Sequence, residues 1–138
     1  MRIIYSYTLF FITGGMNMGI AKRSGIRMNY LGNKEIKTEL KCCLISNIRV
    51  NIPQWTRDLS LAPRWQDVDA VKRNIISFEE FKDRYYQYIL QYKNPEEVYK
   101  KYEGWYLLCC EKDPTYCHRT ILAEWLQKFG YDVKEGLF

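Results

Sequence analysis

The feature that most constrains the fold of this 138-residue chain is an apolar run, followed by a short polar loop and then a helical pattern. The apolar run covers residues 105–110, and the helical pattern covers residues 118–129, where apolar side chains recur at three- and four-residue spacing. Apolar strands separated by helices are typical of a parallel sheet that is buried on both faces. The pattern therefore predicts an α/β fold.

The rest of the chain repeats this alternation. We expect further strands at residues 3–12, 41–48 and 131–134, and further helices at residues 66–73, after Ser77 and after Asn94. Ser77 with Glu80 forms a capping box, and Asn94-Pro95 is a typical helix start. We predict a small three-layer sandwich over residues 1–138, a single domain with a mostly parallel sheet covered by helices on both faces.

Two segments do not show this alternation. Residues 13–32 are rich in glycine, and with a short helix at 33–40 they form a predicted long variable loop over residues 13–40. Residues 51–64 contain two prolines and are predicted as a second loop. The N-terminal residues 3–12 are too short to span a bilayer and lack a signal-peptide cleavage site, so we read them as a strand and expect no membrane partner.

The composition favours a folded domain in a reducing compartment. Twelve Tyr, six Phe and four Trp supply a sizeable core, and a net charge of +5 permits an anionic partner without requiring one. Four of the five cysteines form two adjacent pairs, Cys42-Cys43 and Cys109-Cys110, on predicted strands. Neighbouring side chains of a strand point to opposite faces, so such a pair is poorly placed for a disulfide. We therefore expect free thiols and a cytoplasmic location.

The loop between the last apolar run and the last helix gathers reactive groups. Cys109 and Glu111 lie at the end of the predicted strand, and Cys117 and His118 lie at the start of the helix. In an open α/β sheet, ligands bind at the carboxyl ends of the strands. Since a helix start lowers the pKa of a thiol, Cys117 or Cys109 is a candidate nucleophile, with His118 and Glu111 as acid–base candidates.

Other residues of this region and of the loop 51–64 are candidates for holding an anion. Arg119 follows His118, where unpaired N–H groups and the helix dipole also favour negative charge. In the loop, arginines alternate with tryptophans, an arrangement that can clamp a base and its phosphate. The candidate ligand-binding residues there are Trp55, Arg57 and Arg64.

Each candidate also has a structural explanation. Cys109 can fill core space, the tryptophans of the loop can cap the core, and Glu111 can pair with Arg119 to tie the loop to the helix. Under this alternative the loop is a strand–helix lock in a non-catalytic structural or interaction module.

A metal site is the third alternative. Two cysteines and one histidine fall short of a complete zinc site unless Cys42 or Cys43 contributes from the neighbouring strand. We predict no metal and no cofactor.

Residues 107–126 resemble the signature of the domain of unknown function 488 family. That signature is a strand ending Leu-Leu-Cys, one variable residue, Glu-Lys, a short loop, and Cys-His-Arg opening a helix. It falls on Cys109, Glu111, Lys112, Cys117, His118 and Arg119. The similarity extends back to Ser46 at the end of a strand and to the Pro53-x-Trp55 element.

The resemblance implies an α/β fold and adds Lys112 and Ser46 to the candidate ligand-binding residues, but the family name specifies no activity. The resulting hypothesis is a domain that binds or processes a phosphate-bearing partner, either a nucleotide-like small molecule or nucleic acid. The sequence leaves the oligomeric state open.

Overall fold

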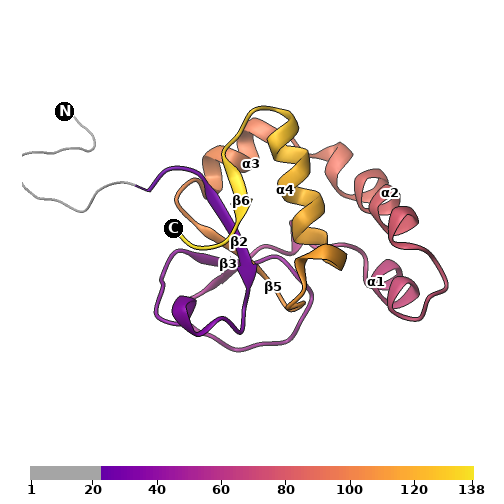
Figure 1. Ribbon diagram of the computed structural model, residues 1–138, viewed down its shortest axis with the longest axis horizontal. Coiled ribbons are helices and arrows are strands. Elements are labelled where there is room, and N and C mark those ends of the chain that lie inside the picture. Colours follow the sequence, from indigo (N-terminus) through magenta and orange to yellow (C-terminus); the bar gives the residue numbers. More distant parts are fainter. Residues whose placement is uncertain (1–22) are drawn as a thin grey trace, which may run out of the picture.

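The computed structural model describes residues 23–138 and confirms an α/β fold around a parallel sheet (Figure 1). Five strands pair in the order β4-β3-β5-β2-β6, and every pairing is parallel. The strands are β2 (Ile26–Tyr30), β3 (Cys42–Leu44), β4 (Thr56–Arg57), β5 (Tyr106–Cys109) and β6 (Val133–Glu135). The strand predicted at residues 3–12 lies outside the described residues.

Four α-helices follow the predicted positions closely. They are α1 (Trp65–Lys72), α2 (Phe78–Tyr88), α3 (Pro95–Tyr102) and α4 (His118–Lys128). Short 3₁₀ helices lie in the connections between elements: η2 (Lys34–Ile36), η3 (Leu59–Leu61), η4 (Leu90–Tyr92) and η5 (Pro114–Tyr116). The predicted caps are confirmed, since the Ser77 hydroxyl accepts the N–H of Glu80 at 3.1 Å and the Asn94 side chain accepts the N–H of Glu96 at 2.9 Å.

Two strands lie in segments that were predicted as loops. In β2 the polar residues Arg27 and Asn29 alternate with apolar ones, and the neighbouring glycines obscured the short pattern. The strand forms because β5 and β6 pair with it on either side. The two-residue strand β4 is too short for any periodicity and depends on pairing with β3.

The two faces of the sheet are covered differently. All four α-helices contribute to the larger apolar core on one face, which includes Leu107 of β5 and Leu122 of α4. On the other face, Ile36 of η2 and Trp55 cover Cys42 and Leu108. Among residues 23–138, helical elements thus cover both faces, but the second face carries only short helices and loops. No helix in this range is long and apolar enough to cross a membrane.

Candidate functional site

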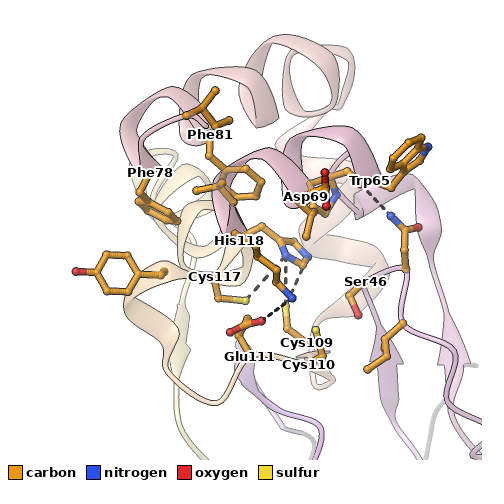
Figure 2. Close-up of a pocket in the computed structure, with 18 of the residues that line it drawn as sticks. Ser46, Trp65, Asp69, Phe78, Phe81, Cys109, Cys110, Glu111, Cys117 and His118 are labelled. Carbon is orange, nitrogen blue, oxygen red and sulfur yellow. Dashed lines mark hydrogen bonds and ion pairs between the residues drawn. The ribbon is translucent and has the colours of Figure 1, made fainter. Parts of the chain in front are cut away.

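A cavity of about 810 Å³ opens where β3 and β5 end and α4 begins (Figure 2). Polar groups at the ends of these three elements line it, and α1 adds Asp69 and Lys72. The groups from the three elements include Ser46, Cys109, Cys110, Glu111, Cys117 and His118. Its apolar wall comes mainly from α1, α2 and η5 and includes Trp65, Val68, Val71, Phe78, Phe81 and Tyr116. The cavity therefore lies at the carboxyl edge of the sheet, as expected for an α/β fold.

Cys117 occupies the N-cap position of α4. Its backbone is extended, with φ −121° and ψ 144°, because η5 ends immediately before it and the helix begins immediately after it. Asp113 starts η5 by accepting the N–H of Thr115 at 2.9 Å, and Pro114 fits the first position of that turn. The local sequence therefore places the thiol against the unpaired N–H groups of the helix start.

His118 is buried and held in one tautomer. Its Nε2 lies 2.6 Å from the carbonyl oxygen of Ile45, which only accepts, so Nε2 carries the proton and donates. Nδ1 then has a free lone pair, which lies 3.6 Å from the Cys109 sulfur and 3.9 Å from the Cys117 sulfur. Tyr85 packs its edge against the imidazole at 5.5 Å between ring centroids. The imidazole is thus positioned to accept a proton from either thiol.

The two thiols beside His118 differ in acidity. The pKa of Cys117 is lowered well below its ordinary value, mainly by a hydrogen bond from the Cys109 thiol, and also by His118 and the N–H of Arg119, against the effect of burial. The pKa of Cys109 is raised, chiefly because the side chain is buried and secondarily because Cys117 lies beside it. The geometry therefore favours a thiolate on Cys117 and a neutral thiol on Cys109.

Glu111 lines the cavity but is not paired with Arg119. Its carboxylate lies 3.1 Å from the ammonium of Lys72, a residue of α1 that also lines the cavity (Figure 2). Cys110 lines the same cavity, contrary to the expectation that it points to the opposite side. Strand alternation does not apply to it because β5 ends at Cys109.

Arg119, which was predicted to hold an anion, does not line the cavity. The side chain is fully buried, and its guanidinium makes an ion pair with Glu135 of β6 at 3.0 Å. It also donates to the carbonyl oxygens of Glu111 and Lys112. Those bonds connect the loop to β6 and α4. The ion pair expected between Arg119 and Glu111 is formed with Glu135 instead.

Four other predicted ligand residues lie outside the cavity lining. Trp55 packs on the opposite face of the sheet, and its indole N–H donates to Glu39 at 2.8 Å. Arg57 donates to the carbonyl oxygens of residues 46, 48 and 50, and so holds the loop after β3. Arg64 pairs with Asp67 at 2.8 Å, and Lys112 is exposed. Trp55, Arg57 and Arg64 thus make contacts within the protein.

Ser46 is the one predicted ligand-binding residue that does line the cavity. Its side chain is only 6% exposed, and its hydroxyl has no hydrogen-bond partner. A buried hydroxyl without a partner is costly, and such groups often mark a place where a ligand or water binds. Sequence reasoning missed Lys72 and the apolar wall, because their patterns are those of ordinary amphipathic helices.

One group of side chains in the described part of the chain could hold a metal ion. The donor atoms of Cys109, Cys117 and His118 all lie within 4.8 Å of one another. Neither Cys42 nor Cys43 belongs to this group, so the fourth ligand considered from the neighbouring strand is absent from it. Two thiols and an imidazole suit a thiophilic ion such as Zn²⁺, with an open position toward the cavity.

Comparison with known proteins gives one match. The family described as "Domain of unknown function DUF488" matches residues 45–126, which include β5, most of α4 and the polar side of the cavity. No curated protein and no solved structure matches the chain.

Proposed function

The chain belongs to the DUF488 family, and on this premise we propose that its cavity is the active site of a thiol-dependent enzyme in which Cys117 is the nucleophile. The observation that carries the proposal is the position of the Cys117 thiol. It lies at the start of α4, 3.9 Å from the free Nδ1 of His118, and lines an open cavity. A thiol is activated by such neighbours, because the thiolate is the attacking form.

The surrounding residues support distinct roles around this thiolate. His118 can take a proton from an incoming or neighbouring group, and the carbonyl of Ile45 keeps its ring in the required orientation. Ser46 offers a hydroxyl with no partner in the protein, which suits a polar atom of a substrate. The reaction supported by these groups is nucleophilic attack by sulfur on a small electrophile.

The cavity favours a substrate with an apolar body and no strong negative charge. Aromatic and aliphatic side chains form its wall, and the ionised groups that line it are Asp69, Lys72 and Glu111. The single cation is already paired with Glu111. A phosphate-bearing ligand, which the sequence favoured, is less well supported because the arginines predicted to hold it make other contacts.

The alternative of a structural lock is supported by the contacts of Arg119, which fasten the loop to β6. This lock does not compete with the proposed reaction, because it holds the loop from the side that faces away from the cavity. We infer a reducing cytoplasmic setting for the enzyme, since all five cysteines are free.

Alkylation of the reduced full-length protein by iodoacetamide tests the proposal. Each cysteine is followed by peptide mapping over time, with and without inorganic phosphate. Cys110 is the most exposed of the five, so accessibility alone predicts that it reacts first. We expect Cys117 to react first instead, because its pKa is lowered while that of Cys110 is raised.

The variant Cys117→Ser should lose the fast phase of alkylation. The matched control is Cys42→Ala, which removes a buried thiol from the opposite face of the sheet and should retain that phase. Phosphate should not protect Cys117. Fast labelling of Cys110 with an unreactive Cys117 would contradict the proposal, and protection by phosphate would favour the phosphate-bearing ligand.

A further inference from the structure

A second thiol lies beside the proposed nucleophile, on a different element. Cys109 ends β5 and Cys117 begins α4, and their sulfur atoms lie within 4.8 Å of each other and of His118 (Figure 2). A nucleophile that transfers a group needs only one thiol and a base. A paired second thiol in the same small cluster is the arrangement required for thiol–disulfide exchange.

We infer that the site exchanges electrons with small disulfides, with Cys117 as the attacking thiol and Cys109 as the resolving thiol. This inference rests on the proposed function, because it requires Cys117 to be the nucleophile, and it adds the substrate class. Access to the cavity divides the roles between the two sulfurs. The rigidity of the loop that joins them favours formation of the disulfide.

Access to the cavity decides which of the two thiols attacks the substrate first. Both cysteines line the cavity, but Cys109 is fully buried at the end of the strand against the imidazole, whereas Cys117 at the helix start keeps 3% of its surface exposed. A substrate disulfide that enters from the apolar side therefore meets Cys117 first.

Hydrogen bonds fix the loop between the two cysteines in one conformation. Arg119 donates to the carbonyl oxygens of Glu111 and Lys112, and Glu135 anchors that guanidinium to β6. Because both ends of the loop are fixed, little chain entropy is lost when the sulfurs join. They must approach from no more than 4.8 Å to the disulfide length of about 2.05 Å.

The chemistry balances without any further reactant. Cys117 gives its proton to Nδ1 of His118, and the resulting thiolate attacks one sulfur of the substrate. The substrate's S–S bond breaks, and the first substrate thiolate takes that proton from Nδ1 as it leaves. Cys109 then gives its proton to Nδ1 of His118, and its sulfur attacks Cys117 in the mixed disulfide. The second substrate thiol leaves with that proton, so the protein is oxidised by two electrons and the substrate disulfide is reduced to two thiols.

The lining of the cavity narrows the substrate class to uncharged or weakly charged disulfides with apolar flanks. Both carboxylates of the lining are ion-paired, Asp69 with Arg73 and Glu111 with Lys72, so the lining offers no unpaired cation to an anionic disulfide. Ser46 can donate its unpartnered hydroxyl to a polar atom beside the reacting sulfur. We therefore expect bis(2-hydroxyethyl) disulfide to react at least about 10-fold faster than oxidised glutathione, which carries net negative charge.

The experiment incubates the reduced full-length protein with each of these two disulfides. Samples are quenched in acid and analysed by intact mass and peptide mapping. Wild-type protein should end with a Cys109–Cys117 disulfide, whereas Cys109→Ser should stop at a mixed disulfide on Cys117. The control Cys42→Ala should behave as wild type. Cys110→Ser should still form the disulfide, and its failure would mean that Cys110 is the resolving thiol.

The outcomes separate this inference from the proposed function. If Cys117 reacts with iodoacetamide but wild type accumulates only a stable mixed disulfide, Cys117 is a nucleophile and the dithiol exchange is wrong. A disulfide confined to other cysteines would also overturn the exchange. If Cys117 reacts with neither reagent in wild type, the proposed function itself fails.

Discussion

Replacing Arg119 with methionine tests whether this residue locks the loop or remains free to bind an anion. Methionine keeps an apolar stem of similar length in a fully buried position and removes only the guanidinium. The carbonyl oxygens of Glu111 and Lys112 then lose a charged donor, and Glu135 loses its ion-pair partner.

The expected loss of stability follows from the groups that lose their hydrogen-bond or ion-pair partner when the guanidinium is removed. A hydrogen bond from a charged donor is worth about 1.5–3 kcal/mol, and two carbonyl groups lose one each. Glu135 is 40% exposed and is rehydrated, so it does not become an unpaired buried charge. Removing the buried guanidinium also ends its own desolvation cost. We therefore expect Arg119→Met to lower the free energy of unfolding by about 2–4 kcal/mol.

Urea unfolding followed by tryptophan fluorescence measures this loss as a lower midpoint with an unchanged slope. The matched control is Arg73→Met, which removes an exposed arginine paired with Asp69 at 3.2 Å one helical turn away. That change should cost no more than about 0.5 kcal/mol. If the two variants lose the same small amount, the guanidinium of Arg119 does not hold the loop, and its role as an anion ligand becomes the better explanation.

Three further predictions concern the cavity and the core beneath it. Because the pKa of Cys117 is lowered, its alkylation rate should change less than about 2-fold between pH 8 and pH 6; a fall of about 10-fold per pH unit, as for an ordinary thiol, would contradict the lowered pKa. His118→Gln should raise the pKa of Cys117, so that its alkylation rate falls more steeply between pH 8 and pH 6 than in wild type, and an unchanged pH profile would exclude the imidazole as its activator. Tyr85→Phe removes a buried hydroxyl that donates to Leu61 at 2.6 Å, and should lower the free energy of unfolding by about 1–2 kcal/mol in urea; an unchanged value would mean that this hydrogen bond contributes nothing.

Part of the candidate site could be predicted from the sequence. The residues around the junction of β5 and α4 could be identified because a strand end and a helix start leave polar side chains at one edge of a parallel sheet. Cys109, Glu111, Cys117 and His118 accordingly line one cavity. The directions of the arginines were not accessible in this way, since each depends on acceptors from distant segments, such as Glu135 for Arg119.

Most of the regular elements could be located from the amino-acid sequence alone, because caps and apolar periodicity act within a few residues. Ser77 and Asn94 cap the helices that their motifs predicted. Tertiary contacts are needed to explain why residues 26–30 form a strand, why Arg119 faces β6, and why Ile45 fixes the tautomer of His118. These features depend on hydrogen-bonding partners brought together by the sheet, and separation along the chain carries no signal of that proximity.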